Sequence, residues 1–144
     1  MLKEVVIAGH FNPLHIGHMR LIEAAKNLGD TLTVIVANDN QASMKREPVF
    51  ITCTDRMYIM SRIKGVDTVV KSIDSTSDIS QTLNMVRPDI FASGCDENHP
   101  DAIEERKICE QLGIETVYNV GGDKIRSSSE LLNKYEKKEN KIIC

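Results

Sequence analysis

Residues 4–18 read EVVIAGHFNPLHIGH, an apolar run followed by a loop with three histidines. The run 4–8 predicts a buried strand, and residues 19–26 predict the helix that follows the loop. A glycine where the strand ends, Gly9, lets a ligand approach the backbone closely. His15 and His18 are three residues apart where the helix begins, so both side chains can point toward one spot. That spot also faces the unpaired amides and positive dipole end of a helix, which favour a phosphate group.

The rest of the chain alternates strands and helices. Further strands are predicted at 31–37, 67–71, 89–92 and 114–120, and further helices at 55–63, 79–86, 102–112 and about 127–137. Gly29 suits the left-handed position after the first helix. Such alternation predicts a Rossmann-like α/β domain over 1–133 with a five-stranded parallel sheet flanked by helices, followed by a lysine-rich tail over 134–144. Ligands of such sheets bind where the strands end, so we expect loops 9–18, 38–52, 93–99 and 121–128 to converge.

Composition excludes several classes of function. The net charge of −3 argues against a nucleic-acid binder that works through a broad basic face. No apolar run approaches the roughly twenty residues of a membrane span, and the N-terminus enters a strand at once, so neither a membrane segment nor a signal peptide is expected. Four widely spaced cysteines without metal-type pairing indicate reduced thiols. We therefore expect a cytoplasmic protein.

The loop 9–18 resembles the G-x-F-x-P/x-x-H-x-G-H signature of the HIGH-motif nucleotidyltransferase superfamily. Its small members include glycerol-3-phosphate cytidylyltransferase, phosphopantetheine adenylyltransferase, the heptose-phosphate adenylyltransferase domain and archaeal FAD synthetase. His10 stands where Thr or Ser is usual, and Asn12 where Asp is common. The resemblance implies a nucleotidyltransferase whose nucleotide contacts include Gly9, His10, Phe11, His15, Gly17 and His18.

Nucleotidyl transfer requires alignment and charge stabilisation, because an acceptor oxygen attacks the α-phosphorus and pyrophosphate leaves. The resemblance assigns His18 to the α-phosphate and His15 to the phosphate chain; alternatively, the two histidines only pack or bind a metal. Lys45, in the loop after the second strand, matches a lysine that contacts phosphates in similar enzymes. A lysine in a polar loop is otherwise simply solvated. The predicted catalytic residues are therefore His15, His18 and Lys45.

A second motif, GGDKIRSSSE at 121–130, resembles the I-S-T-T or I-S-S-S element that closes over the nucleotide in this superfamily. It supplies cations and hydroxyls at a helix start, which can bind phosphate oxygens. Ser127 and Glu130 also fit a capping box, which is the structural alternative. Asp96 follows the fourth strand where relatives carry G-G-D or G-D-D, and it suits base or ribose recognition or metal support. This part of the predicted nucleotide site comprises Asp96, Lys124, Arg126, Ser127 and Ser128.

The resemblance limits the substrates less than the reaction. Residues 87–96 are more similar to the heptose-phosphate adenylyltransferase pattern, which favours ATP over CTP, with a sugar or polyol phosphate as acceptor. FMN is the rival acceptor, although the cysteine pair expected near the closing motif of FAD synthetase is absent and aromatic residues are few. Mg²⁺ should accompany the triphosphate, no protein metal ligands are assigned, and the resemblance implies a homodimer. Alternatives of another class are a non-catalytic nucleotide-binding regulatory module and a fragment resembling a class I aminoacyl-tRNA synthetase.

Overall fold

The computed structural model describes residues 2–45, 48–122 and 131–134, and its five strands form one all-parallel sheet. The order across the sheet is β3-β2-β1-β4-β5. The bounds in chain order are β1 Glu4–Gly9, β2 Thr31–Val36, β3 Thr68–Lys71, β4 Ile90–Ala92 and β5 Glu115–Val117. This arrangement confirms the predicted Rossmann-like α/β fold. The direction of strand addition reverses between β1 and β4, which is where ligands bind in such sheets.

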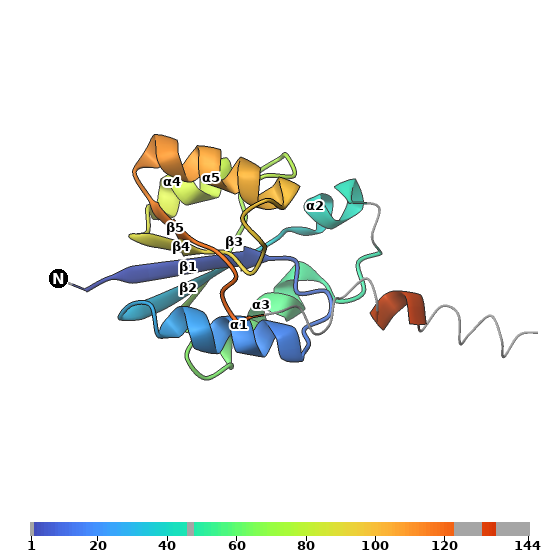
Figure 1. Ribbon diagram of the computed structural model, residues 1–144. Helices are drawn as coiled ribbons and strands as arrows, with labels where there is room; N and C mark the ends of the chain where they lie inside the picture. The colour runs from blue at the N-terminus through green and yellow to red at the C-terminus, as the bar shows by residue number, and fades with distance from the viewer. Residues whose placement is uncertain (1, 46–47, 123–130, 135–144) are drawn as a thin grey trace, which may run out of the picture.

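Two layers of helices cover the sheet (Figure 1). Helices α1 (Ile16–Lys26) and α3 (Cys53–Ser61) lie on one face, whereas α4 (Ser80–Val86) and α5 (Pro100–Leu112) lie on the other. The short helix α2 (Asp39–Met44) lies beyond the end of β2, on the side where the strands end. Among the described residues, no helix has the length and apolar character needed to cross a membrane.

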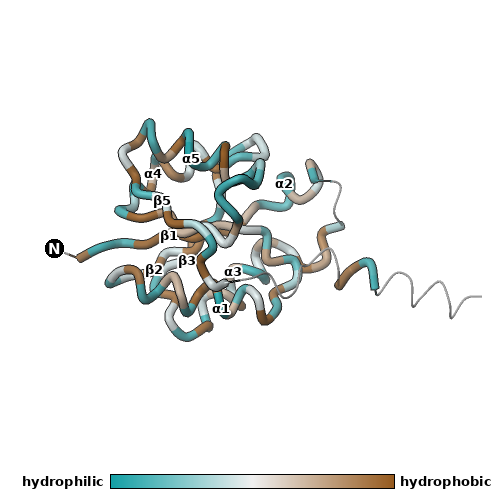
Figure 2. The backbone as a smooth tube through the Cα atoms, in the orientation of Figure 1, coloured by the Kyte–Doolittle hydropathy of each residue, from teal (hydrophilic) through white to brown (hydrophobic). Residues whose placement is uncertain are grey.

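The strands separate two apolar cores. Val5 and Ile7 of β1 belong to the core beneath α1 and α3, while Val6 between them belongs to the core beneath α4 and α5. All three are fully buried, as expected of a central parallel strand whose alternate side chains face covered layers. In Figure 2 the apolar colour follows the central strands, and the helices show a mixture of polar and apolar segments. Cys53 and Cys109 lie one in each core, where burial raises the pKa of both thiols.

Besides several helix and strand ends that shift by one or two residues, four details differ from the sequence-based expectations. Helix α1 begins three residues early, because His15 caps it. The expected loop 38–52 contains α2, whose Asn38 and Gln41 form a reciprocal capping box. Strand β5 is shorter than predicted. Gly29 does not adopt the left-handed conformation; instead, a Cβ there would lie 2.7 Å from Val5 Cγ2 and 2.8 Å from the Lys3 carbonyl oxygen, so close packing requires the glycine.

The C-terminal part of the chain is described only in part. Residues 131–134 are helical, within the helix predicted for 127–137. The tail beyond residue 134 and segment 123–130 lie outside the described residues.

Candidate active site

A cavity of about 840 Å³ opens where the strands end, beside the reversal between β1 and β4. Its volume is in the range typical of small-molecule sites, about 300–1,000 Å³. Its wall is formed by the exits of β1, β2, β4 and β5, helix α1, helix α2, the loop before α4 and helix α5. The loops that were expected to converge therefore do so, as far as the structure describes them.

The paired histidines line this cavity and also cap α1. The Gly17 amide donates to His15 Nδ1 at 3.1 Å, and the His15 amide donates to His18 Nδ1 at 3.2 Å. The sequence predicted unpaired amides at this helix start. Instead, the amides of Gly17 and His15 each donate to an imidazole, because the two rings form the capping box. The rings stack with centroids 3.8 Å apart. Since each Nδ1 accepts, a neutral ring carries its proton on Nε2, from which it can donate to a phosphate oxygen.

Phe11 packs against His18 of this pair. Its ring is 2% exposed and meets His18 edge-on, with centroids 4.9 Å apart. A Cβ on Gly9 would lie 3.0 Å from Phe11 Cζ, so the glycine at the strand exit leaves room for this ring. Packing within the protein therefore explains Gly9, in addition to the approach of a ligand that the sequence suggested.

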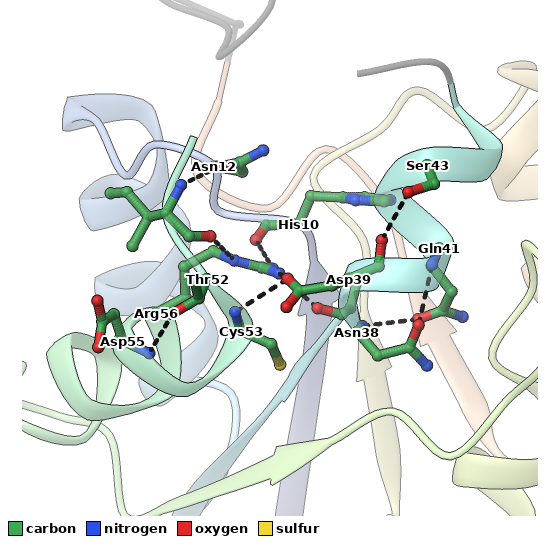
Figure 3. Close-up of polar contacts among 12 residues, drawn as sticks. His10, Asn12, Asn38, Asp39, Gln41, Ser43, Thr52, Cys53, Asp55 and Arg56 are labelled. Carbon is green, nitrogen blue, oxygen red and sulfur yellow. Dashed lines mark hydrogen bonds and ion pairs between the residues drawn. The ribbon is translucent and has the colours of Figure 1, made fainter. Parts of the chain in front are cut away.

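A buried arginine holds the strand exits together (Figure 3). The Arg56 side chain of α3 is fully buried, and its Nη1 donates to the carbonyl oxygens of His10 at 2.6 Å and Ala37 at 2.8 Å. Its Nε donates to the Ile51 carbonyl at 2.8 Å, and its Nη2 pairs with Asp39 Oδ1 at 2.9 Å. One guanidinium thus fixes the backbone after β1, the backbone after β2 and the start of α2.

Side-chain amides position the neighbouring loops. The buried Asn12 donates to the Pro48 carbonyl at 2.8 Å and accepts from the Ile51 amide at 2.9 Å. A carboxylate could not make the first of these bonds, so the departure from the superfamily pattern has a structural use. Gln41 Nε2 donates to the carbonyls of Thr76 and Asp78, which holds the cavity-lining loop before α4 against α2.

The remaining wall comes from the ends of β4 and β5. The Val120 amide donates to the Ser93 carbonyl at 3.0 Å, which joins the two exits. A Cβ on Gly121 would lie 3.0 Å from the Leu21 amide nitrogen, and φ of Gly121 is +93°. Only a glycine therefore lets this loop press against α1. The start of the second motif enters the same cavity as the histidine pair.

Comparisons with known proteins agree with this geometry. A family model described as cytidylyltransferase-like matches residues 6–139. The chain belongs to the cytidylyltransferase-like family. It is 33% identical over 132 residues to an FAD synthase of Picrophilus torridus, and the match covers 89% of this chain and 92% of that protein.

Two further similarities agree. The cytidylyltransferase-like chain is 34% identical over 114 residues to the bifunctional protein HldE of Desulfatibacillum aliphaticivorans, a match that covers 77% of this chain and 22% of that protein. The crystal structure of a lipopolysaccharide core biosynthesis protein from Thermoplasma volcanium matches with a TM-score of 0.69 at 30% identity, covering 82% of this chain and 94% of that one. The protein is a nucleotidyltransferase.

The structure brings most of the predicted site residues to the one cavity of this cytidylyltransferase-like domain. The predicted residues that line the cavity are Gly9, His10, Phe11, His15, Gly17, His18, Lys45 and Asp96. Lys45 is exposed at the end of α2, and Asp96 accepts from the Asn98 amide at 2.9 Å. His99 caps α5 by accepting from the Asp101 amide. Lys124, Arg126, Ser127 and Ser128 lie outside the described residues.

Sequence reasoning missed four residues of this region in the cytidylyltransferase-like domain. Asn38 and Gln41 carry the spacing of a capping box, which could have revealed α2. Arg56 shares the buried face of α3 with Cys53 and Met60, and a charged residue at that spacing was the available signal. Glu105 lines the cavity from the helix predicted for 102–112, and no motif identifies it.

Asp96 is a candidate carboxylate ligand for the expected magnesium ion. Among the described residues, no group of three His, Cys, Asp or Glu side chains is arranged to hold a metal ion. Mg²⁺ in nucleotide sites commonly uses one or two carboxylates together with phosphate oxygens and water. Asp96 lines the cavity and provides one such carboxylate.

Proposed function

We propose that this protein transfers AMP from ATP to the phosphate of FMN, forming FAD and releasing pyrophosphate. An oxygen of the FMN phosphate attacks the α-phosphorus, a new P–O bond forms, and the bond to the pyrophosphate oxygen breaks. The observation that carries nucleotidyl transfer is the stacked pair His15 and His18, with both Nδ1 atoms occupied by amides at the wall of the cavity. The similarity to an FAD synthase supports FMN as the acceptor.

In this reaction the side chains align the phosphates and stabilise charge. The ring proton of His18 would donate to the α-phosphate and that of His15 to the phosphate chain, while the start of α1 contributes its positive dipole end. Lys45, on the opposite wall, would contact an acceptor or triphosphate phosphate. The acceptor phosphate is already ionised at neutral pH, so no general base is required. Mg²⁺, when bound beside Asp96, would supply additional positive charge to the phosphates.

A sugar phosphate is the second candidate acceptor. It was the preferred acceptor from the sequence, and the similarity to the HldE protein and to the lipopolysaccharide core biosynthesis protein favours it. By family resemblance we also propose that ATP is preferred to CTP and that the protein is a homodimer, which sedimentation equilibrium would test.

The experiment is a matrix in which purified protein with Mg²⁺ receives ATP or CTP together with FMN, a heptose phosphate, another sugar phosphate or glycerol phosphate. Pyrophosphate release and thermal shift are measured in each well, and His18→Asn protein provides the background. We expect release with ATP and FMN. Release with a sugar phosphate instead would support the second candidate. Stabilisation by ATP without release from any pair would support a regulatory nucleotide-binding module and overturn the proposed function.

A further inference from the structure

The wall of the cavity opposite the histidine pair has a different chemical character. Helix α2, the loop before α4 and helix α5 form it. Ile79 and Ile108 are partly buried there and pack against the core beneath α4 and α5. Both residues present aliphatic surface to the cavity, which suits a flat ring better than a phosphate.

Glu105 of α5 is the polar group that stands out on this wall. Its Oε2 is shielded from solvent and has no hydrogen-bond partner among the residues that the structure describes. The Ser93 side chain at the β4 exit also acts on the carboxyl group. A buried oxygen without a partner costs about 1–3 kcal/mol, so a ligand that satisfies it gains affinity.

The surroundings of Glu105 favour the neutral acid. Burial raises the pKa of this carboxyl to about 7, the negative charges of Asp101 and Glu104 act in the same direction, and Lys45 and the Ser93 hydrogen bond oppose them. Nucleotidyl transfer to a phosphate requires no general base, which leaves the proton available for recognition. A neutral carboxylic acid presents a donor and an acceptor side by side.

We infer that the Glu105 carboxyl group binds the edge of a heteroaromatic ring that carries a hydrogen-bond donor next to an acceptor, with Ile79 and Ile108 against the ring. The inference rests on the proposed function, because that reaction brings two such rings to the cavity. Adenine presents an amino group next to a ring nitrogen, and the flavin presents a ring N–H next to a carbonyl. A phosphate beside this carboxyl is disfavoured, since it would be an anion next to a group that can ionise.

The test measures equilibrium binding of FMN and of a non-hydrolysable ATP analogue separately to the full chain. Wild type is compared with Glu105→Gln and Glu105→Ala, with Glu110→Gln as a control on an exposed position of the same helix. Each is measured at about pH 6 and about pH 8.5, on either side of the Glu105 pKa of about 7. Thermal unfolding shows that each variant is folded.

For the ligand that Glu105 contacts, we expect Glu105→Ala to weaken binding about 10–100-fold at the lower pH. The ratio of wild-type to Glu105→Gln affinity should fall about tenfold toward the higher pH, because the amide keeps a donor and an acceptor without titrating. A loss confined to the ATP analogue identifies adenine, and a loss confined to FMN identifies the flavin.

Two results overturn the inference. If the ratio is constant with pH for both ligands, or if Glu105→Ala binds both as wild type does, Glu105 recognises neither ring. When the same preparation still makes FAD, the proposed function stands and only this inference fails. When wild type binds neither FMN nor the ATP analogue, both fail together.

Discussion

The imidazole rings of His15 and His18 lie with their centroids 3.8 Å apart, and the His15 amide donates to His18 Nδ1. Capping uses Nδ1 of His18, whereas the proposed phosphate contact would use Nε2. The variant His18→Asn separates them, because the asparagine oxygen can accept the amide proton but nothing replaces Nε2. We expect turnover to fall about 100–1,000-fold, as for loss of one preorganised donor. Pyrophosphate release measures turnover. The free energy of unfolding, measured with urea, should change by about 1 kcal/mol or less.

Thr52→Ala is the capping control, because Thr52 caps α3 through its side chain and does not line the cavity. It should retain turnover close to wild type. Equal turnover of His18→Asn and wild type with every productive substrate pair would remove His18 from the reaction.

The Arg56 clamp predicts a large effect from a conservative change. In Arg56→Lys, one ammonium replaces a planar fork that reaches the carbonyls of His10, Ala37 and Ile51. At least one buried carbonyl loses its donor, so we expect the free energy of unfolding to fall by about 2–4 kcal/mol. Arg62→Lys, at an exposed position just after the same helix, should change it by about 0.5 kcal/mol or less. Similar urea midpoints for the two variants would show that the clamp contributes little.

Gly9→Ala tests the contact between the strand exit and Phe11. The new Cβ would lie 3.0 Å from the ring, which must move and so disturb the edge contact with His18. We expect destabilisation of about 1–3 kcal/mol, as for other overpacked cores, together with reduced turnover. Gly94→Ala at the end of β4 is the control, because its Cβ would meet Leu21 at an ordinary 3.7 Å. Equal melting temperatures for both alanine variants would contradict this account.

The Glu105 carboxyl predicts a pH dependence of stability in the protein without ligands. Its pKa is 4.5 in a model peptide and about 7 in the folded protein, so between these values only the folded state retains the proton. Stability therefore falls as pH rises through this window. Relative to Glu105→Gln, wild type should lose about 2–3 kcal/mol between about pH 5 and about pH 8.

Urea unfolding across this range measures the difference. Asp101, Glu104 and Lys45 remain in both proteins, so their contributions largely cancel. Glu110→Gln should follow wild type at every pH. Parallel curves for wild type and Glu105→Gln would place the Glu105 pKa near its ordinary value.

The fold was predictable because the hydrophobic pattern and the breakers agree. Continuous apolar runs such as that of β2 indicate strands covered on both faces, and Gly113 ends α5 in the left-handed conformation that favours a glycine. Gly29 was misinterpreted because the same residue type serves turns and close packing, and only the position of Val5 distinguishes them.

The site was predictable where a motif carried it. The signature loop placed His15 and His18 at the cavity wall, although no sequence pattern revealed that they cap α1 themselves. The roles of Arg56 and Glu105 depend on which side of each helix is covered and on which segment covers it. That information comes from contacts between segments far apart in the chain, such as Arg56 with His10.

Arg56 donates hydrogen bonds to three main-chain oxygens, at positions 10, 37 and 51. Every amino acid offers such an oxygen, so this attachment places no demand on the side chains at those positions. Related proteins that share this arginine could therefore differ in the residues around the mouth of the cavity, and in the substrates that they bind, while they keep the same internal hydrogen bonds.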